Sequence, residues 1–313
     1  MTVFLLTVVI CFCIFALLCE FVGRMFLKSL KHHHPKDGVV SYQDIPFYQQ
    51  GPLHDAVKKG IAYLETLSYQ EITISSFDNT HLHGYLFSSD QPSNTYIICT
   101  HGFQSHGFNE FSMHMEYYHS MNCNVIIVDN RGHGLSEGDY ITMGVLDRLD
   151  VVEWAKYLVN SYGQNIRIFL HGVSMGASTV LSASAEKELP VQVAGIISDC
   201  GFSSIKDIFD EQLHGITWLS DIFLSACQRH AKAKAGFYFD EAAPIDAVKK
   251  TTIPILFVQG TKDTMVPVYM AKKLYDACQS KKELYLVDQA NHAESIAYDP
   301  EGYHCKITEL LEN

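Results

Sequence analysis

The sequence predicts an α/β fold: a mostly parallel, doubly wound sheet with helices on both faces. Two observations lead to this prediction. Short apolar segments of strand length alternate along the chain with longer segments of helix length. The apolar segments carry hydrophobic residues at almost every position, which is typical of parallel strands buried on both faces. With 313 residues, 47% of them hydrophobic, the chain is long enough to fill the core of one large domain.

The first residues predict a transmembrane anchor over residues 1–23. The run from Thr2 to Val22 has 21 residues and one charged side chain, Glu20. A helix of this length crosses the hydrocarbon core of a bilayer. A cleaved signal peptide is the alternative, but no Lys or Arg precedes the run and no small-residue cleavage site follows it. We therefore expect a retained, single-pass anchor.

Positive charge follows this anchor. Arg24, Lys28, Lys31 and Lys36 lie on its C-terminal side, and the positive-inside rule then places the rest of the chain in the cytoplasm. The cysteines outside the anchor show no C-x-x-C spacing and no compact disulfide framework, which agrees with a reducing compartment. An extracellular orientation stays open. A metal site at His32-His33-His34 is conceivable, but a solvated linker is the simpler interpretation.

Residues 24–67 are predicted to form a linker and a leading helix, Asp55 to Leu67. Two segments, Tyr69–Ser76 and His81–Phe87, flank a turn and predict an opening antiparallel hairpin. The strands expected after it are Thr95–Thr100, Asn124–Asp129, Ile166–Leu170, Val193–Asp199, Pro254–Gln259 and Glu283–Val287. The helices expected between these strands are Asn109–Ser120, Met143–Ser161, Ala177–Ala185 and Ala271–Gln279. Together these elements define a domain over residues 68–313.

One interval is too long for a simple crossover between strands. Residues 203–250 contain a helical segment, Trp218–Arg229, with apolar residues on one face. We predict a small helical cap over the carboxyl ends of the strands; an insertion that only packs against the domain is the alternative. Its larger apolar residues would either line an acyl-binding pocket or fill the cap itself: Phe209, Trp218, Leu219, Phe223, Phe237 and Tyr238.

A short motif at the end of a predicted strand indicates a catalytic serine. Gly172-Val173-Ser174-Met175-Gly176 follows an apolar segment and precedes a helix rich in small residues. This order is that of a nucleophile elbow, in which a sharp turn exposes the serine hydroxyl above the sheet. The two glycines are needed because side chains there would collide with the neighbouring strand and helix. A glycine turn without catalytic function is the alternative.

A serine hydroxyl needs a base, and the base needs an orienting acid. In a parallel sheet, catalytic side chains lie in the loops after the carboxyl ends of strands. The loop after Pro254–Gln259 contains Asp263, and the loop after Glu283–Val287 contains His292. The resulting chain order of serine, acid and histidine is that of one large hydrolase fold.

These motifs make the chain resemble the α/β-hydrolase superfamily, in particular its serine-aminopeptidase-type branch and bacterial membrane-anchored hydrolases. The resemblance extends from about residue 70 to the C-terminus. The matching motifs are Thr100-His101-Gly102-Phe103, Asp129-Asn130-Arg131-Gly132-His133-Gly134-Leu135-Ser136, Gly172-Val173-Ser174-Met175-Gly176, Gly260-Thr261-Lys262-Asp263 and Asn291-His292. Together these motifs are highly specific for the fold, but they say little about which substrate is cleaved.

The resemblance implies a role for each matching catalytic residue. Ser174 would be the nucleophile, and His292 the general base and later the acid. Asp263 would be the carboxylate that orients the histidine. The backbone N–H groups of Phe103 and Met175 would form the oxyanion hole.

Other polar residues of these motifs have less direct roles. Asp199, at the end of an earlier strand, is an alternative acid, because a few relatives place the acid there. Asp288 would be a turn residue or a support for the histidine. His101 is expected to hold the oxyanion loop, and Arg131 and His133 are expected to fix the loop after their strand.

The expected reaction is hydrolysis of an acyl substrate through an acyl-enzyme, which needs no cofactor. We favour a small-molecule carboxylic ester; a peptidase is the second interpretation and a thioesterase the third. A non-catalytic binding module on the same fold is the non-enzymatic alternative. The net charge of −12, with the only strongly basic segment next to the anchor, argues against nucleic acid as a partner. The sequence does not give the oligomeric state.

Overall fold

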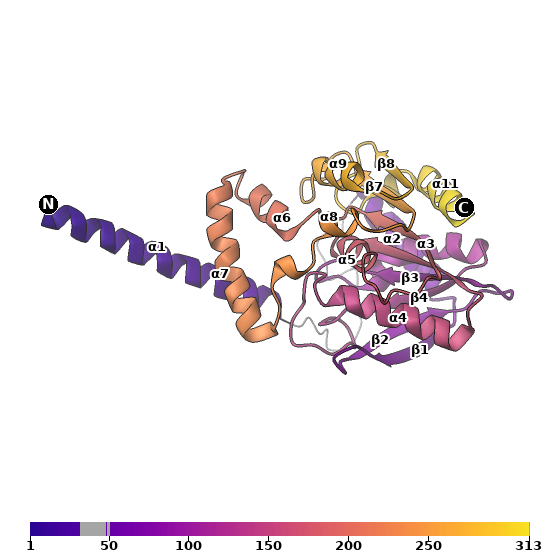
Figure 1. Ribbon diagram of the computed structural model, residues 1–313. Helices are drawn as coiled ribbons and strands as arrows, with labels where there is room; N and C mark the ends of the chain where they lie inside the picture. Colours follow the sequence, from indigo (N-terminus) through magenta and orange to yellow (C-terminus); the bar gives the residue numbers. More distant parts are fainter. Residues whose placement is uncertain (32–47, 49–50, 313) are drawn as a thin grey trace.

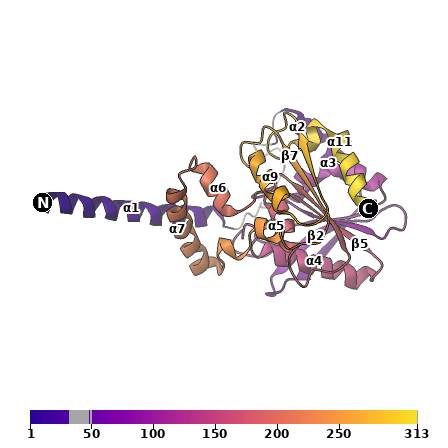
Figure 2. The same cartoon turned by 45° about the horizontal axis from the view of Figure 1, so that its top comes forward.

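The computed structural model of the protein describes residues 1–31, 48 and 51–312 (Figure 1). The His32-His33-His34 cluster and Lys36 lie outside the described residues. A sheet with helices on both faces forms the body of the molecule, and one long N-terminal helix projects from it (Figure 2).

Within the described residues the sheet has eight strands, in the order β1-β2-β4-β3-β5-β6-β7-β8. β1 and β2 form an antiparallel hairpin, β2 also pairs antiparallel with β4, and all other neighbours are parallel. The strands are β1 (Gln70–Ser75), β2 (His81–Phe87), β3 (Thr95–Thr100), β4 (Asn124–Val128), β5 (Arg167–Val173), β6 (Val193–Asp199), β7 (Ile255–Gly260) and β8 (Lys282–Val287). The predicted fold class is therefore confirmed, including the opening hairpin.

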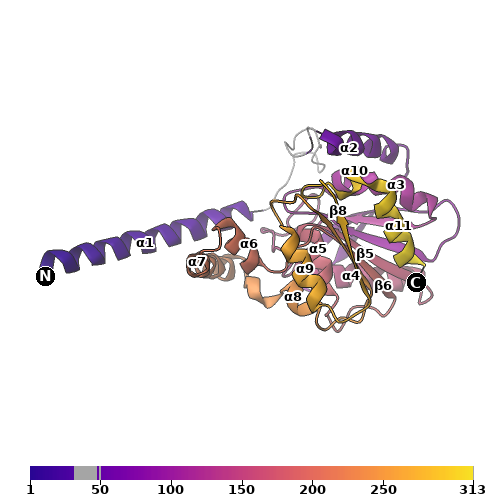
Figure 3. The same cartoon turned by 90° about the horizontal axis from the view of Figure 1, so that it is seen from above.

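Helices cover both faces of this sheet, as the view from above shows (Figure 3). One face is covered by α3 (Gly107–Ser120), α10 (Ser295–Tyr298) and α11 (Pro300–Leu311), with α2 (Gly51–Leu64) outside α3. The other face is covered by α4 (Asp147–Tyr162), α5 (Met175–Ala183) and α9 (Val268–Ala277). The cap consists of α6 (Ile205–Gln212), α7 (Thr217–Ala235), the 3-10 turn Phe239–Glu241 and α8 (Pro244–Ala247).

The core divides into two apolar layers because successive side chains of a strand point to opposite faces. In β3, Ile97 and Cys99 belong to the layer beneath α3 and α11, whereas Tyr96 and Ile98 belong to the layer beneath α4 and α5. The strands are apolar at nearly every position because their side chains pack into both layers. Trp154 of α4 is among the largest side chains fully buried there.

Several helices differ from the prediction: α2 lies over Gly51–Leu64 rather than Asp55–Leu67, and α9 begins at Val268 rather than at Ala271. α4 begins at Asp147 rather than at Met143, because Met143 and Gly144 have φ angles of 54° and 88° and so cannot continue a right-handed helix. α11 was not predicted. Its signals are present in the sequence: Pro300 occupies the first turn, and the Asp299 carboxylate accepts a hydrogen bond from the N–H of Gly302 at 2.9 Å.

The N-terminal helix α1 (Thr2–Ser29) continues beyond the predicted end of the anchor. Among the described residues it is the one helix long and apolar enough to cross a membrane, with a mean hydropathy of 2.8 over its most apolar part. Its end joins the body of the molecule: Leu30 is fully buried beside Met175 and cap residues, and its carbonyl accepts a hydrogen bond from the N–H of Ile141 at 2.6 Å. The cap itself packs on Met175 and Val266, next to the carboxyl ends of β5 and β7.

Candidate active site

Ser174 occupies the sharp turn between β5 and α5. Its φ of 55° lies in the left-handed region, with ψ at −116°, and a non-glycine residue there stores about 1–3 kcal/mol of strain. A Cβ atom on Gly172 would lie 2.3 Å from the backbone of Gly176, and one on Gly176 would lie 1.9 Å from the carbonyl oxygen of Thr100. Glycine at both positions therefore permits the turn that holds the serine hydroxyl above the sheet.

We expect Gly176→Ala to lower the free energy of unfolding by about 3 kcal/mol or more, because β3 and α5 would have to separate to admit the methyl group. Urea unfolding followed by circular dichroism measures this. Gly236→Ala is the control: Gly236 has a φ of 83° and open space around it, so the substitution should reduce stability by about 1–2 kcal/mol. Equal losses for the two variants would contradict the steric argument.

Three side chains from separate loops form one hydrogen-bonded chain beside this turn. Nε2 of His292 lies 2.8 Å from Oγ of Ser174, and Nδ1 of the same ring lies 2.8 Å from Oδ2 of Asp263. The three loops follow β5, β7 and β8, whose parallel alignment brings their carboxyl ends to one edge of the sheet. The structure thus brings together the three residues that the sequence analysis selected.

The Asp263 carboxylate is fully buried and has several hydrogen-bond donors. Oδ1 accepts from the backbone N–H groups of Met265 and Val266 at 2.9 and 2.8 Å, and Oδ2 accepts from Nε2 of Gln259 at 2.8 Å. These donors fix the carboxylate and replace the water lost on burial. Sequence reasoning missed Gln259; its only signal is a polar residue near the end of an apolar strand.

Asp199, the alternative acid, lies nearby but has a different partner. Its Oδ1 accepts a hydrogen bond from Oγ of Ser295 at 3.4 Å, while Nδ1 of His292 faces Asp263. Burial, and secondarily the charge of Asp263, raises the pKa of Asp199 to about 7. The geometry therefore favours Asp263. Asp288 is an exposed turn residue that accepts a hydrogen bond from Oγ1 of Thr261.

The backbone N–H groups of Phe103 and Met175 are unused donors. Met175 is the first residue of α5, and Phe103 follows β3. Among the described residues neither N–H donates a hydrogen bond, and a Cβ atom on Gly102, the residue before Phe103, would lie 3.3 Å from the Cβ of Ser174. Their placement beside the serine is that of a pair of oxyanion-hole donors.

Buried polar residues hold the loop that carries Phe103. Nε2 of His101 accepts a hydrogen bond from the N–H of Asn130 at 3.2 Å, and Nε2 of His133 accepts one from the N–H of Gln104 at 3.1 Å. Burial lowers the pKa of His101 to about 4, so this ring is neutral at pH 7. His101 was expected to hold this loop, whereas His133 was expected to fix the loop after its own strand and here also bonds to Gln104 of the oxyanion loop.

Arg131 holds the loop after β4. Its guanidinium donates to Oδ1 and Oδ2 of Asp150 at 2.7 and 2.9 Å and to Oδ2 of Asp78 at 2.7 Å. The guanidinium and Asp150 are both buried, so their charges compensate each other within the fold. Arg131 therefore stabilises the fold through Asp150 and Asp78, and it does not contact Ser174.

Sequence reasoning also missed Glu110, in the first turn of α3. Its Oε2 accepts a hydrogen bond from the N–H of Gly102 at 2.9 Å, and its Oε1 accepts one from the hydroxyl of Tyr48 at 3.4 Å. Burial raises the pKa of Glu110 to about 7. A carboxyl group that titrates near neutral pH thus lies beneath the oxyanion loop. The sequence marks it only as an acidic residue in a helical first turn.

A cavity of about 220 Å³ adjoins the serine. It is smaller than the roughly 300–1,000 Å³ of pockets for drug-sized ligands. Its lining residues are Tyr48, Gly102, Phe103, Gln104, Ser105, Glu110, Ser174, Met265, His292 and Ala293. None of the cap aromatics considered for an acyl pocket lines it. Phe209 instead packs on Phe26 and Phe223 on Phe15, so these residues join the cap to α1.

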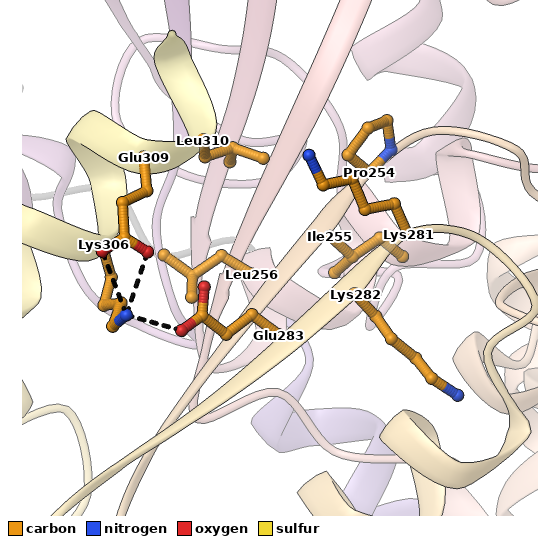
Figure 4. A pocket seen from close by; sticks show the side chains of 9 residues that line it. All are labelled: Pro254, Ile255, Leu256, Lys281, Lys282, Glu283, Lys306, Glu309 and Leu310. Atoms are coloured by element: carbon orange, nitrogen blue, oxygen red, sulfur yellow. Dashed lines mark hydrogen bonds and ion pairs between the residues drawn. The ribbon is translucent and has the colours of Figure 1, made fainter. Parts of the chain in front are cut away.

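A second cavity, of about 170 Å³, lies at the opposite, amino-terminal ends of β7 and β8 (Figure 4). Nζ of Lys306 binds Glu283 at 2.7 Å and Glu309 at 2.9 Å there. These charges satisfy one another, and the cavity lies far from the loops that carry the serine and histidine.

One group of side chains has the composition of a metal site. Potential ligand atoms of Cys200, Asp263 and His292 lie within 4.8 Å of one another. Both ring nitrogens of His292 are already engaged by Asp263 and Ser174, and burial raises the pKa of the Cys200 thiol well above its ordinary value. The donor set therefore fits a catalytic hydrogen-bond chain better than a cation.

The sheet order, the strained serine turn and the loops around it define an α/β hydrolase. The chain belongs to the prolyl oligopeptidase family, whose sequence model matches residues 109–302. The superfamily expected from the sequence is thereby confirmed, while the serine-aminopeptidase-type branch stays a prediction.

The chain is similar in sequence to bacterial and yeast proteins and in fold to a solved esterase. The chain is 28% identical over 295 residues to the uncharacterized protein YqkD of Bacillus subtilis, covering 88% of this chain and 92% of the relative. It is 24% identical to an uncharacterized membrane protein of Saccharomyces cerevisiae, over 78% of this chain and 80% of that one. A solved structure, an esterase of Pyrococcus furiosus, has a TM-score of 0.65 and 22% identity, covering 90% of this chain and 98% of its own.

Proposed function

We propose that this protein is a membrane-anchored serine hydrolase that cleaves small carboxylic esters. The observation that carries the proposal is the continuous hydrogen-bonded chain from Ser174 Oγ through His292 to Asp263. A buried carboxylate fixes the ring so that Nδ1 carries a proton and Nε2 accepts the serine hydroxyl, which is the arrangement that activates a serine for attack.

In the first half of the reaction, Oγ of Ser174 attacks the ester carbonyl while Nε2 of His292 takes the hydroxyl proton. The carbonyl oxygen becomes an oxyanion that accepts hydrogen bonds from the N–H groups of Phe103 and Met175. Each such donor contributes roughly 3–4 kcal/mol to the stability of the transition state. The C–O bond then breaks, and His292 returns the proton to the leaving alcohol, leaving an acyl group on the serine.

The second half releases the acid. Water loses a proton to Nε2 of His292 and attacks the acyl carbonyl, and the oxyanion again accepts from the same two N–H groups. When the C–Oγ bond breaks, the proton returns to Ser174 and the carboxylic acid leaves. Asp263 keeps its charge throughout and stabilises the protonated ring.

The cavity beside Ser174 indicates the size of the acyl group. Phe103, Met265 and Ala293 give it apolar walls, and its volume of about 220 Å³ suits a short acyl chain. The similar structures include both esterases and peptidases, so the choice of an ester rests on this cavity.

A peptidase is the second candidate, because the family takes its name from an oligopeptidase. Hydrolysis of p-nitrophenyl esters of increasing chain length, compared with aminoacyl p-nitroanilides, separates the two. We expect kcat/KM for butyrate-sized esters to exceed that for every anilide by at least about 100-fold. A preference for anilides would establish the peptidase, a preference for acyl thioesters the thioesterase, and no turnover of any substrate the non-catalytic module.

We also propose that α1 spans the membrane and that the hydrolase domain faces the cytoplasm. Exposed Arg24 and Lys28 on the C-terminal side of the apolar run support this orientation, as does the absence of disulfides among the described cysteines. The yeast relative, described as a membrane protein, supports the membrane location. Protease protection of the domain in sealed inverted vesicles would argue against the cytoplasmic orientation.

The charge of Glu110 should influence the pH dependence of the reaction. We expect kcat/KM to rise with pH through the neutral range, because attack by the serine needs an unprotonated general base. Glu110, whose pKa burial raises to about 7, becomes increasingly ionised over this range, and its negative charge opposes the loss of a proton from a nearby base. Glu110→Gln removes that charge, so the midpoint of the rise should move to lower pH, by about 0.5–1 unit.

A pH profile of kcat/KM measures this shift. Glu116→Gln, on the exposed side of the same helix, is the matched control and should leave the profile unchanged. A shift of the Glu110→Gln profile to higher pH, or none, would contradict the predicted coupling.

A further inference from the structure

α1 is packed along the cap rather than hanging from the domain by a linker. The ring centroids of Phe15 and Phe223 lie 6.4 Å apart. A Cβ atom on Gly23 would lie 2.6 Å from the ring of His230 and 3.0 Å from the carbonyl oxygen of Ala226, so the two helices approach closely at this glycine. Cys19 is also buried, although Leu18 before it is exposed. The contact between α1 and α7 therefore covers several helical turns.

The depth of this contact follows from helix geometry. Phe15 lies inside the apolar run Thr2–Val22, five residues, or about 7–8 Å at 1.5 Å per residue, before Glu20, the one charged residue of the run. The hydrocarbon core of a bilayer is about 30 Å thick, so a helix needs about 20 apolar residues to cross it and this run would have to use the part that contains Phe15. If α1 crosses the membrane, Phe15 must lie within the apolar layer. Phe223 of the cap, which touches Phe15, must then lie at or within the same boundary.

The cap is apolar where this geometry requires it. Ile216, Trp218 and Ile222, at the start of α7, are 45%, 61% and 37% exposed, respectively, although they are large apolar residues. In all three views, α6 and α7 lie between the free part of α1 and the sheet (Figures 1, 2 and 3). We call the set formed by Ile216, Trp218, Ile222 and Phe223 the apolar edge of the cap.

Charges along the same contact are also suited to a membrane boundary. Glu20, the one charged residue in the apolar run, is paired with Arg229 at 2.6 Å and with His230 at 2.9 Å. An acidic side chain at the membrane boundary is thus compensated by the cap. The C-terminal part of α7 carries Arg229, Lys232 and Lys234, whose positive charges would be attracted to an anionic lipid surface.

We propose that the apolar edge of the cap inserts into the interfacial layer of the bilayer that α1 crosses. The cap would then be a second membrane contact, in addition to the anchor. Because Nε2 of Gln104 donates a hydrogen bond to the carbonyl of Ser29 at 2.9 Å, the oxyanion loop is tied to the end of α1. The two contacts together fix the active-site cavity at a defined height and orientation above the lipid.

The tryptophans provide a direct test, because the chain has two of them. Trp218 belongs to the apolar edge, whereas Trp154 is 1% exposed within the core beneath α4. The full chain is reconstituted in phosphatidylcholine–phosphatidylglycerol vesicles with or without brominated acyl chains, which quench tryptophan on contact. Wild type minus Trp218→Tyr gives the emission of Trp218, and the variant alone gives that of Trp154.

We expect brominated lipid to quench at least about half of the Trp218 emission and less than about a tenth of the Trp154 emission. Aqueous iodide should quench Trp218 several-fold less in vesicles than in a detergent that leaves the edge accessible. Trp218 emission that is insensitive to brominated lipid and fully sensitive to iodide would overturn the proposal.

A second variant tests the edge without altering the reporter. Ile216→Asn combined with Ile222→Asn should reduce the quenching of Trp218 by brominated lipid at least two-fold, and unchanged quenching would also contradict insertion. Neither measurement depends on turnover, so the result stands whether or not the proposed esterase activity is found.

Discussion

Ser174→Ala is expected to lower kcat for a short p-nitrophenyl ester by about 10⁴–10⁶-fold, the range seen when a serine nucleophile is removed from a working triad. The loss follows because Oγ of Ser174 is the atom that attacks the carbonyl and the partner of Nε2 of His292. Stability should change little, since alanine adopts the strained turn at no greater steric cost than serine. Initial rates of ester hydrolysis by the full chain in detergent or nanodiscs measure the effect.

Ser120→Ala is the matched control, because Ser120 is an exposed residue at the end of α3, away from the site. It should retain full activity. A Ser174→Ala variant that keeps more than about a tenth of the wild-type rate would show that another group performs the attack.

Asp263→Asn is expected to reduce kcat by about 10⁴-fold, with KM little changed. Asparagine can keep most of the hydrogen bonds around the carboxylate, but its amide N–H₂ group favours the wrong tautomer of His292, with the proton on Nε2. The ring then cannot accept the hydroxyl proton of Ser174. Steady-state kinetics at several pH values measure the loss.

Asp199→Asn is the matched control for this loss, because Asp199 lies in the same buried region at the end of β6. Burial raises the pKa of Asp199 to about 7, so a neutral side chain is already substantially populated at neutral pH. We expect the variant to keep kcat within about tenfold of wild type. A larger loss for Asp199→Asn than for Asp263→Asn would exchange the roles of the two acids.

The strands and the catalytic loops could be predicted from sequence for a physical reason. A strand whose side chains pack into two core layers is apolar at nearly every position, so the first polar residues after it mark its end in the sequence. The loops that contain Asp263 and His292 follow β7 and β8 and were found in this way. The elbow was visible because its geometry permits only glycine at two fixed positions. Both signals depend only on residues close together in the chain. Both also mark the carboxyl ends of parallel strands, which lie at the same edge of the sheet.

The supporting residues could not be predicted in this way. Glu110 and Gln259 act on groups eight and four residues away, but through hydrogen bonds that depend on how a loop folds back on a helix or strand. From the sequence alone, a glutamate at position 110 or a glutamine at position 259 could equally be a buried side chain that supports the site or an exposed one. Their identification required the positions of Gly102 and Asp263 in space.

The contact between α1 and the cap was hidden for a different reason. A helix that is apolar on all sides gives no indication of which face packs against protein, so Phe15 and Cys19 do not differ in sequence from their neighbours. The cap aromatics were correctly seen as apolar, but the sequence left open whether they face a substrate. Phe209 and Phe223 contact the anchor helix instead.

The integration of α1 also determines which form of the protein should be studied. Leu30 is fully buried in the cluster that contains Met175, one of the two proposed oxyanion donors. Removing the N-terminal helix would therefore expose apolar surface next to the active site. Activity is best measured on the full chain.

The most direct test of an activated serine is covalent labelling of the full chain with a fluorophosphonate, followed by mass spectrometry of the peptides. We predict a single adduct on Ser174, formed in wild type, lost in Ser174→Ala, and slowed at least about 100-fold in Asp263→Asn. Folded wild-type protein that is not labelled, or is labelled on a different serine, would contradict the assignment of Ser174, His292 and Asp263 as a catalytic triad.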